Sequence, residues 1–232
     1  MKRLLTLSII TGLVFAGSMA FAQNKEIQNS QLYRHYQMKY VFGMKYNDSD
    51  VAKSALYDMI ALDTSDDSLK FNLTYLYFDE GQFASALFIS ADILSRKPEN
   101  KEALNISAVC YERMGLRDKA ISAYESLYML DNSLETLYQM AALQFEIGRY
   151  KECRNNAKIL VEKPKAKELK IGFQKSERET QEVSLEAAGY NLLGMVDKEQ
   201  GNKVEAKKHF QKAIELYPEF VLAKDNVAEL DK

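Results

Sequence analysis

The sequence predicts an all-α protein built as an array of repeated helix hairpins, and three observations carry this prediction. Turn-forming residues recur along the chain, each followed five positions later by a small residue; the turn residues are Asn47, Gly81, Gly115, Gly148 and Gly201, and the small residues are Ala52, Ala86, Ala120, Cys153 and Ala206. Both columns advance by 34, 34, 33 and 53 residues, and a period near 34 residues is typical of helical repeats. The chain also has only 3 prolines among 232 residues, in a composition that favours helix.

The first 22 residues have the features of a bacterial signal peptide. Two basic residues precede an apolar stretch over residues 4–15, and residues 20–22 supply the small side chains at alternate positions that signal peptidase requires. We therefore expect residues 1–22 to be removed, Gln23 to become the N-terminus, and the product to be soluble in the periplasm or secreted. An uncleaved anchor is the alternative, but the apolar stretch is short for a membrane span, so we expect no membrane insertion after signal cleavage.

The charge balance and the scarcity of reactive residues argue against several classes of function. Lys and Arg number 31 and Asp and Glu 33, so no general attraction to nucleic acid or anionic lipid is expected. His35 and His209 lie on different repeats without metal-binding spacing, no phosphate loop is present, and we expect His209 on a solvated, lysine-rich surface. We predict no catalytic site, no metal and no cofactor; an enzyme would require the carboxylates of residues 177–182 to line a cleft.

The two cysteines stand at positions suited to short apolar side chains. Cys153 belongs to the small-residue column, and Cys110 lies shortly before the turn at Gly115, on a helix of the preceding repeat. We expect both to be structural free thiols, while a disulfide stays open as the alternative in an exported protein.

Residues 102–132 show what one repeat contains. Apolar residues recur at helical spacing on both sides of the turn at Gly115: Leu104, Ala108 and Tyr111 before it, and Ala120, Tyr124, Leu127 and Tyr128 after it. Two short amphipathic helices joined by a tight turn cannot bury their apolar faces alone, so neighbouring hairpins must stack.

These hairpins resemble tetratricopeptide repeats. The fifth copy matches the signature of that family best, through Tyr190, Leu193, Gly194, Gly201, Ala206, Phe210, Ala213 and Pro218; the second copy carries Leu73, Tyr77, Gly81, Phe83, Ala86 and Pro98. The first copy departs from the pattern, with Lys39 and Gly43 where apolar and aromatic residues are expected. The resemblance implies a right-handed superhelical solenoid of about five tetratricopeptide helix hairpins that binds a protein or peptide.

This assignment gives six segments: a signal peptide (1–22), an N-terminal segment (23–32), repeats 1 to 4 (33–167), an insertion (168–186), repeat 5 (187–220) and a C-terminal capping helix (221–232). Apolar and polar residues alternate on both sides of residues 175–178, which predicts a small β-hairpin in the insertion; a charged helical extension is the alternative. The capping helix is predicted from a one-sided apolar stripe that would cover the last hydrophobic face: Phe220, Ala223, Val227 and Leu230.

Several first helices carry more apolar residues than their cores need. Phe71, Tyr75 and Phe78 lie four and three residues apart and so share a second face of their helix, and Tyr138 and Phe145 repeat the positions of Phe71 and Phe78. Val41 and Met44 extend this set in the first repeat. The resemblance implies that first helices line the concave surface, so we predict a groove with these partner-binding residues: Phe71, Tyr75, Phe78, Asn105, Val109, Arg113, Tyr138 and Phe145.

We therefore predict a non-catalytic protein–protein interaction module, an adaptor or assembly factor that binds a peptide or partner helix in an aromatic groove. For the aromatic surface, the alternatives are that residues 24–32 fold back over the rings or that tight curvature buries them. For the function, the alternative is a structural subunit of an envelope complex that self-associates into a homo-oligomer.

Overall fold

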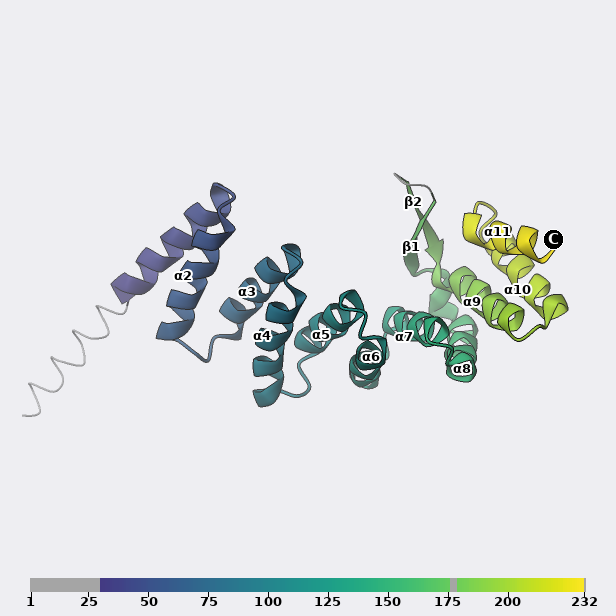
Figure 1. Cartoon of the computed structure of the whole chain (residues 1–232), viewed down its shortest axis with the longest axis horizontal. Coiled ribbons are helices and arrows are strands. Elements are labelled where there is room, and N and C mark those ends of the chain that lie inside the picture. The colour runs from purple at the N-terminus through teal and green to yellow at the C-terminus, as the bar shows by residue number, and fades with distance from the viewer. Residues whose placement is uncertain (1–29, 176–178, 232) are drawn as a thin grey trace, which may run out of the picture. The chain divides into compact units, whose positions relative to one another are not determined.

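The computed structural model of the chain describes residues 30–175 and 179–231 (Figure 1). The predicted signal peptide and residues 23–29 lie outside the described residues. The chain divides into two compact units, Met1–Ile89 and Ser90–Lys232, which we call unit 1 and unit 2 and describe separately. Among the described residues, no helix has the length and apolar character needed to cross a membrane.

Unit 1 consists of helices packed around a small apolar core. A helix covers residues 30–45, so residues 30–32, assigned to the N-terminal segment from the sequence, are already helical. It is followed by α2 (Ser49–Leu62), α3 (Asp67–Asp79) and the beginning of α4 (Phe83–Arg96), which crosses the division between the units. The core of unit 1 contains Leu56, Met59, Leu69 and Leu73, and the half-buried rings of Tyr33, Tyr36 and Tyr40 pack against it.

Unit 2 continues as consecutive helices, each packed on the next: α5 (Lys101–Arg113), α6 (Arg117–Asp131), α7 (Leu134–Glu146), α8 (Tyr150–Glu162), α9 (Leu185–Glu199), α10 (Lys203–Leu216) and α11 (Val221–Leu230). A short 3-10 helix (Pro164–Lys167) and two strands, β1 (Lys170–Gln174) and β2 (Thr180–Ser184), stand between α8 and α9. One continuous apolar core runs from α5 through α9.

The predicted repeat is confirmed by the backbone at the five turn residues. All five have positive φ, from 55° at Asn47 to 79° at Gly201, a region that favours glycine and tolerates asparagine. In each case the residue after the turn donates its N–H to the carbonyl four positions before the turn residue, as in the 2.8 Å bond from Gln82 to Tyr77, which closes a Schellman motif. The five small residues that follow are all 0% exposed: Ala52, Ala86, Ala120, Cys153 and Ala206.

The departure of the first repeat at Gly43 has a steric cause. A Cβ atom on Gly43 would lie 2.7 Å from the backbone nitrogen of Ala52, so the helix over residues 30–45 and α2 approach too closely there for a side chain. The aromatic residue that the family pattern expects at this position would separate the two helices.

The insertion forms the predicted β-hairpin and not a helical extension. Strands β1 and β2 pair antiparallel, with Lys170 opposite Ser184 and Gln174 opposite Thr180. Val183 is fully buried, and Ile171 and Phe173 pack against the helical core. The hairpin therefore has one face on the helices of unit 2 (Figure 1).

Helix α11 covers the end of unit 2, as predicted. Phe220 and Ala223 are 0% exposed, and they form a small cluster with Val183, Ala187 and Ala213. One polar residue that the apolar stripe did not predict is also buried: Asn226 donates its side-chain amide to Asn191 Oδ1 over 3.1 Å. The buried amide is thus paired across the contact between α11 and α9.

Candidate partner-binding surface

Unit 1 exposes apolar side chains at equivalent positions of two successive first helices. Val41 and Tyr75 each stand six residues before a turn residue, and they are 50% and 43% exposed. Met44, three residues before its turn residue, is 48% exposed, and Phe71 on α3 is half-buried. We call Val41, Met44, Phe71 and Tyr75 the inner face of unit 1.

Phe78 and Phe145 have a partner that the sequence analysis did not anticipate. The ring of Phe78 lies 5.3 Å from that of Phe83, and the ring of Phe145 lies 5.5 Å from that of Tyr150, between centroids. In both hairpins the first aromatic residue stands three positions before the turn glycine and the second stands two positions after it. These pairs close the hairpin turns, and both phenylalanines are half-buried.

Tyr138 is a core residue, so its assignment to an open groove is wrong. It is 8% exposed, and its ring lies 6.2 Å from that of Phe173 on β1, which in turn lies 4.9 Å from Phe220. Burial raises the pKa of the Tyr138 hydroxyl above its ordinary range. Tyr138 stands at the same repeat position as Phe71, ten residues before the turn glycine. In unit 2 the β-hairpin of the insertion therefore covers this repeat position.

The predicted residues of the third repeat present a mainly polar surface. Asn105 and Arg113 are exposed, whereas Val109 is half-buried against the core. Glu112, between these positions, accepts a hydrogen bond from the Tyr124 hydroxyl over 3.2 Å. Of the eight predicted residues, three therefore lie in unit 1 and five in unit 2, and the exposed aromatic residue among them, Tyr75, lies in unit 1.

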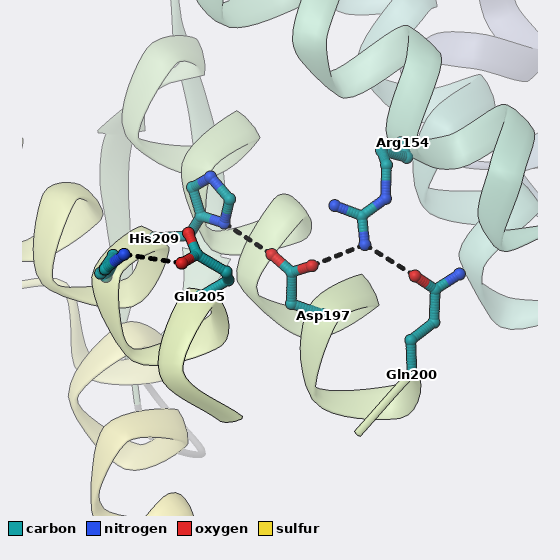
Figure 2. Close-up of polar contacts among 6 residues, drawn as sticks. Arg154, Asp197, Gln200, Glu205 and His209 are labelled. Carbon is teal, nitrogen blue, oxygen red and sulfur yellow. Dashed lines mark hydrogen bonds and ion pairs between the residues drawn. The ribbon is translucent and has the colours of Figure 1, made fainter. Parts of the chain in front are cut away.

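A charged cluster in unit 2 joins three helices (Figure 2). The side chain of Asp197 on α9 is 3% exposed; Oδ1 lies 2.6 Å from Arg154 Nη2 of α8, and Oδ2 lies 2.7 Å from His209 Nδ1 of α10. Arg154 Nη2 also donates to Gln200 Oε1 over 2.8 Å. The expectation that His209 is solvated is wrong, because its ring is paired with a buried carboxylate. Nothing in the sequence indicated this, since Asp197 is 12 residues from His209 and Arg154 is a further 43 residues from Asp197.

The geometry of this cluster suits it to holding helices together. Both carboxylate oxygens of Asp197 are engaged, and a buried charge is stable only when it is paired in this way. Among the described residues, no group of three or more His, Cys, Asp or Glu side chains could hold a metal ion.

The two cysteines are free and buried, which agrees with the structural role expected for them. Burial raises the pKa of the Cys110 thiol to about 11 and that of Cys153 to about 12. Both thiols are therefore protonated at neutral pH, the form that is unreactive as a nucleophile.

Comparison with known proteins agrees with this architecture. Residues 59–158 match the family model of the anaphase-promoting complex, cyclosome, subunit 3, and residues 187–220 match that of the tetratricopeptide repeat. No curated protein matches the chain.

Solved structures share the fold at low sequence identity. A tetratricopeptide repeat protein from Parabacteroides merdae is 20% identical with a TM-score of 0.65, over 86% of this chain and 72% of that one. MamA is 16% identical with a TM-score of 0.63 (81% and 92% covered), and YrrB, described as a tetratricopeptide repeat protein with an unusual peptide-binding site, is 15% identical with a TM-score of 0.62 (80% and 87% covered). The stacked hairpins with their left-handed turn residues, the family match over residues 187–220 and these structures together show a tetratricopeptide repeat fold.

Proposed function

We propose that the protein is a non-catalytic interaction module, an adaptor or assembly factor, that binds a peptide or partner helix on the inner face of unit 1. One observation carries the proposal: Val41 and Tyr75 occupy matching repeat positions and are 50% and 43% exposed, and Met44 on the same helix as Val41 is 48% exposed. Large apolar side chains gathered on an exposed face commonly mark a binding site.

The composition of this face indicates the chemistry of the partner. Its members are aliphatic, thioether and aromatic residues, and exposed charged residues such as Arg34, Lys45 and Asp79 occur on the same two helices. An apolar centre with a polar rim favours a segment that presents large apolar residues, such as the apolar face of an amphipathic helix. The peptide-binding site in the description of YrrB supports a peptide as the partner class.

We also propose that the partner is met outside the cytoplasm. The basic start, apolar stretch and Ala-Phe-Ala sequence over residues 20–22 support export. N-terminal sequencing of the protein from an envelope fraction is expected to begin at Gln23; a full-length chain retained in the membrane would contradict export.

Capture from envelope extract tests the binding face. The test variant is Val41→Ser with Tyr75→Ser, and the matched control is Phe88→Ser with Met129→Ser, which removes side chains that are 77% and 82% exposed on second helices. We expect the test variant to weaken capture of the main partner by about 2 kcal/mol or more, because large apolar residues dominate binding energy, while the control captures normally. Quantitative mass spectrometry measures capture and circular dichroism measures folding; equal capture by both variants, with both folded, would place the binding site elsewhere.

A further inference from the structure

The helix over residues 30–45 has a second exposed apolar side, distinct from the inner face. We call it the end face; its residues are Leu32, His35, Met38 and Phe42 on the helix and Tyr46 in the turn that follows it. Four of them are 43%, 51%, 46% and 69% exposed, in the order Leu32, Met38, Phe42 and Tyr46. At 3.6 residues per turn, these residues follow one stripe, separate from Tyr33, Tyr36 and Tyr40, which pack on the core of unit 1.

The later repeats show what this side of a first helix normally contacts. Twelve residues before the turn residue stand Leu69, Ala103, Thr136 and Gly189, all buried. A Cβ atom on Gly189 would lie 2.7 Å from Val161 Cγ1 and 3.1 Å from Leu160 Cδ2, both on α8. This position therefore faces the second helix of the preceding repeat.

The position five residues before the turn residue behaves in the same way in unit 2, while Leu76 at this position in unit 1 is half-buried. Cys110, Leu143 and Val196 are 0%, 3% and 0% exposed there, and the first helices α7 and α9 pack on the preceding helices α6 and α8. In the first repeat the two positions hold His35 and Phe42, which are exposed. The end face is thus a repeat-to-repeat contact surface without a covering repeat among the described residues.

The two ends of the array differ in this respect. At the C-terminal end, the exposed side of α11 carries Lys224, Asp225, Ala228 and Glu229. A polar helix of this kind does not complement an apolar end face, so head-to-tail stacking of copies is disfavoured. Among residues 23–29, which lie outside the described residues, Ile27 is the one large apolar residue.

We propose that the end face binds the end face of a second copy of this chain. Within the array, consecutive helices joined by short turns run antiparallel, so a covering helix must run antiparallel to residues 30–45. A two-fold axis perpendicular to this helix supplies such a helix from the second copy, and two-fold dimers are the commonest oligomers.

The sequence of the end face is compatible with pairing to itself. With the axis between residues 38 and 39, His35 of one copy faces Phe42 of the other, and Leu32 lies within one residue of the level of Tyr46. The exposed cations Arg34 and Lys45 lie outside the end face, as does Met44. Lys39 is engaged within its own copy, with Asp58 at 3.1 Å and Ser54 at 2.8 Å.

The molar mass of the protein in solution tests the dimer. Expressed from the full sequence and purified in the form the cell yields, the wild type is expected to sediment as a dimer at micromolar concentration. Phe42→Glu should raise the dimer dissociation constant at least about tenfold, because it places a carboxylate in the contact. The control, Met44→Glu, alters the inner face of the same helix and should leave the dimer intact. A monomeric wild type at high micromolar concentration, or a dimer lost with Met44→Glu but not with Phe42→Glu, would overturn the proposal.

A cross-link provides an independent measurement. Both native thiols are buried, so the thiol introduced by Met38→Cys is the accessible one in each copy. It lies close to the proposed two-fold axis. Mild oxidation should join Met38→Cys chains into covalent pairs, whereas Met129→Cys, with its thiol on α6, should stay monomeric on a denaturing gel. Equal cross-linking of both variants would show random collision and would refute the end-face dimer. Because these measurements involve no partner, they stand apart from the capture test; a monomeric wild type whose partner capture is lost with Phe42→Glu would instead assign the end face to that partner.

Discussion

Units 1 and 2 are built from the same repeat but treat equivalent positions differently. Phe71 in unit 1 and Tyr138 in unit 2 both stand ten residues before a turn glycine. Phe71 is half-buried on an open helix, whereas Tyr138 is covered by Phe173 of the β-hairpin. The comparison shows that a repeat position does not by itself determine whether an aromatic residue is available to a partner; a later insertion can cover it.

The two units also differ in how their helices are tied together. Unit 2 has the buried Asp197 between three helices and the amide pair of Asn191 and Asn226. In unit 1, Lys53 pairs with Glu80 at 2.7 Å, and this carboxylate is 26% exposed where that of Asp197 is 3% exposed; the pair raises the pKa of Lys53 and lowers that of Glu80. We therefore expect unit 2 to be the more rigid scaffold and unit 1 the more accessible surface.

The largest effect is expected at Asp197. Asp197→Ala leaves Arg154 and His209 without their shared partner, and the free energy of unfolding of unit 2 should fall by about 3 kcal/mol, since breaking a buried ion pair strands the remaining charge. Urea denaturation with hydrogen exchange to locate the effect measures this loss. The control is Glu229→Ala, whose pair with Lys198 is exposed; its effect should stay within about 1 kcal/mol. Equal effects would mean that the buried cluster does not distinguish unit 2.

Removing the hairpin contact should make unit 2 resemble unit 1. Phe173→Ala deletes the ring between Tyr138 and Phe220, and we expect a loss of about 2 kcal/mol, below that of a fully buried phenylalanine. Tyr138 should at the same time become accessible to nitration by tetranitromethane, identified by peptide mapping. If Tyr138 stays protected although Phe173 is gone, other residues cover it and the hairpin is not what closes this position.

The small-residue column should respond alike in both units. Ala52→Leu and Ala120→Leu each add bulk at a side chain that is 0% exposed, and each should cost about 1–3 kcal/mol through overpacking. Thermal unfolding measures the loss, and Ser122→Leu, at an exposed position of the same helix as Ala120, is the control. An unchanged melting curve for either alanine variant would contradict the close helix approach in that unit.

The smallest effect concerns the thiols of unit 2. Because burial raises the pKa of Cys110 to about 11 and of Cys153 to about 12, native protein at pH 8 should react with a thiol reagent only as fast as it opens. In the unfolded chain both thiols ionise near pH 8.5, so their contribution to stability is fully present below that pH and is lost as the pH rises toward 11. Fast labelling of native protein at pH 8 would show that this core is looser than its burial indicates.

The sequence could predict the repeat because its signals are local. A positive φ at Gly81 or Gly115 and a fully buried Ala86 or Ala120 each follow from one residue type at one position. The strands of the insertion were equally predictable, since apolar and polar residues alternate within β1 and β2, and this alternation can be recognised without knowing what the strands contact.

The candidate site was harder to predict because it depends on contacts between distant segments. Period-two patterning gives the strands but not the helix on which they dock, so the burial of Tyr138 under Phe173 was not visible. Arg154, Asp197 and His209 lie on three helices with no shared motif. By contrast, the ring contacts of Phe83 and Tyr150 could have been predicted from the sequence. An aromatic residue two positions after a turn glycine is within reach of one three positions before it.

The left-handed turns have a consequence for the chirality of the chain. At Gly81, Gly148 and Gly201 a Cβ atom would meet nothing within 4 Å, so the requirement for glycine there comes from handedness and not from space. A D-alanine, the mirror image of the natural residue, prefers positive φ and has fewer unfolded conformations than glycine. Placed at any of these turns by chemical ligation, it should fit the native backbone and stabilise the hairpin by about 0.4–1 kcal/mol, whereas L-alanine should destabilise it by about 1–2 kcal/mol. The array therefore contains, at regular intervals, positions where the opposite enantiomer is the better building block.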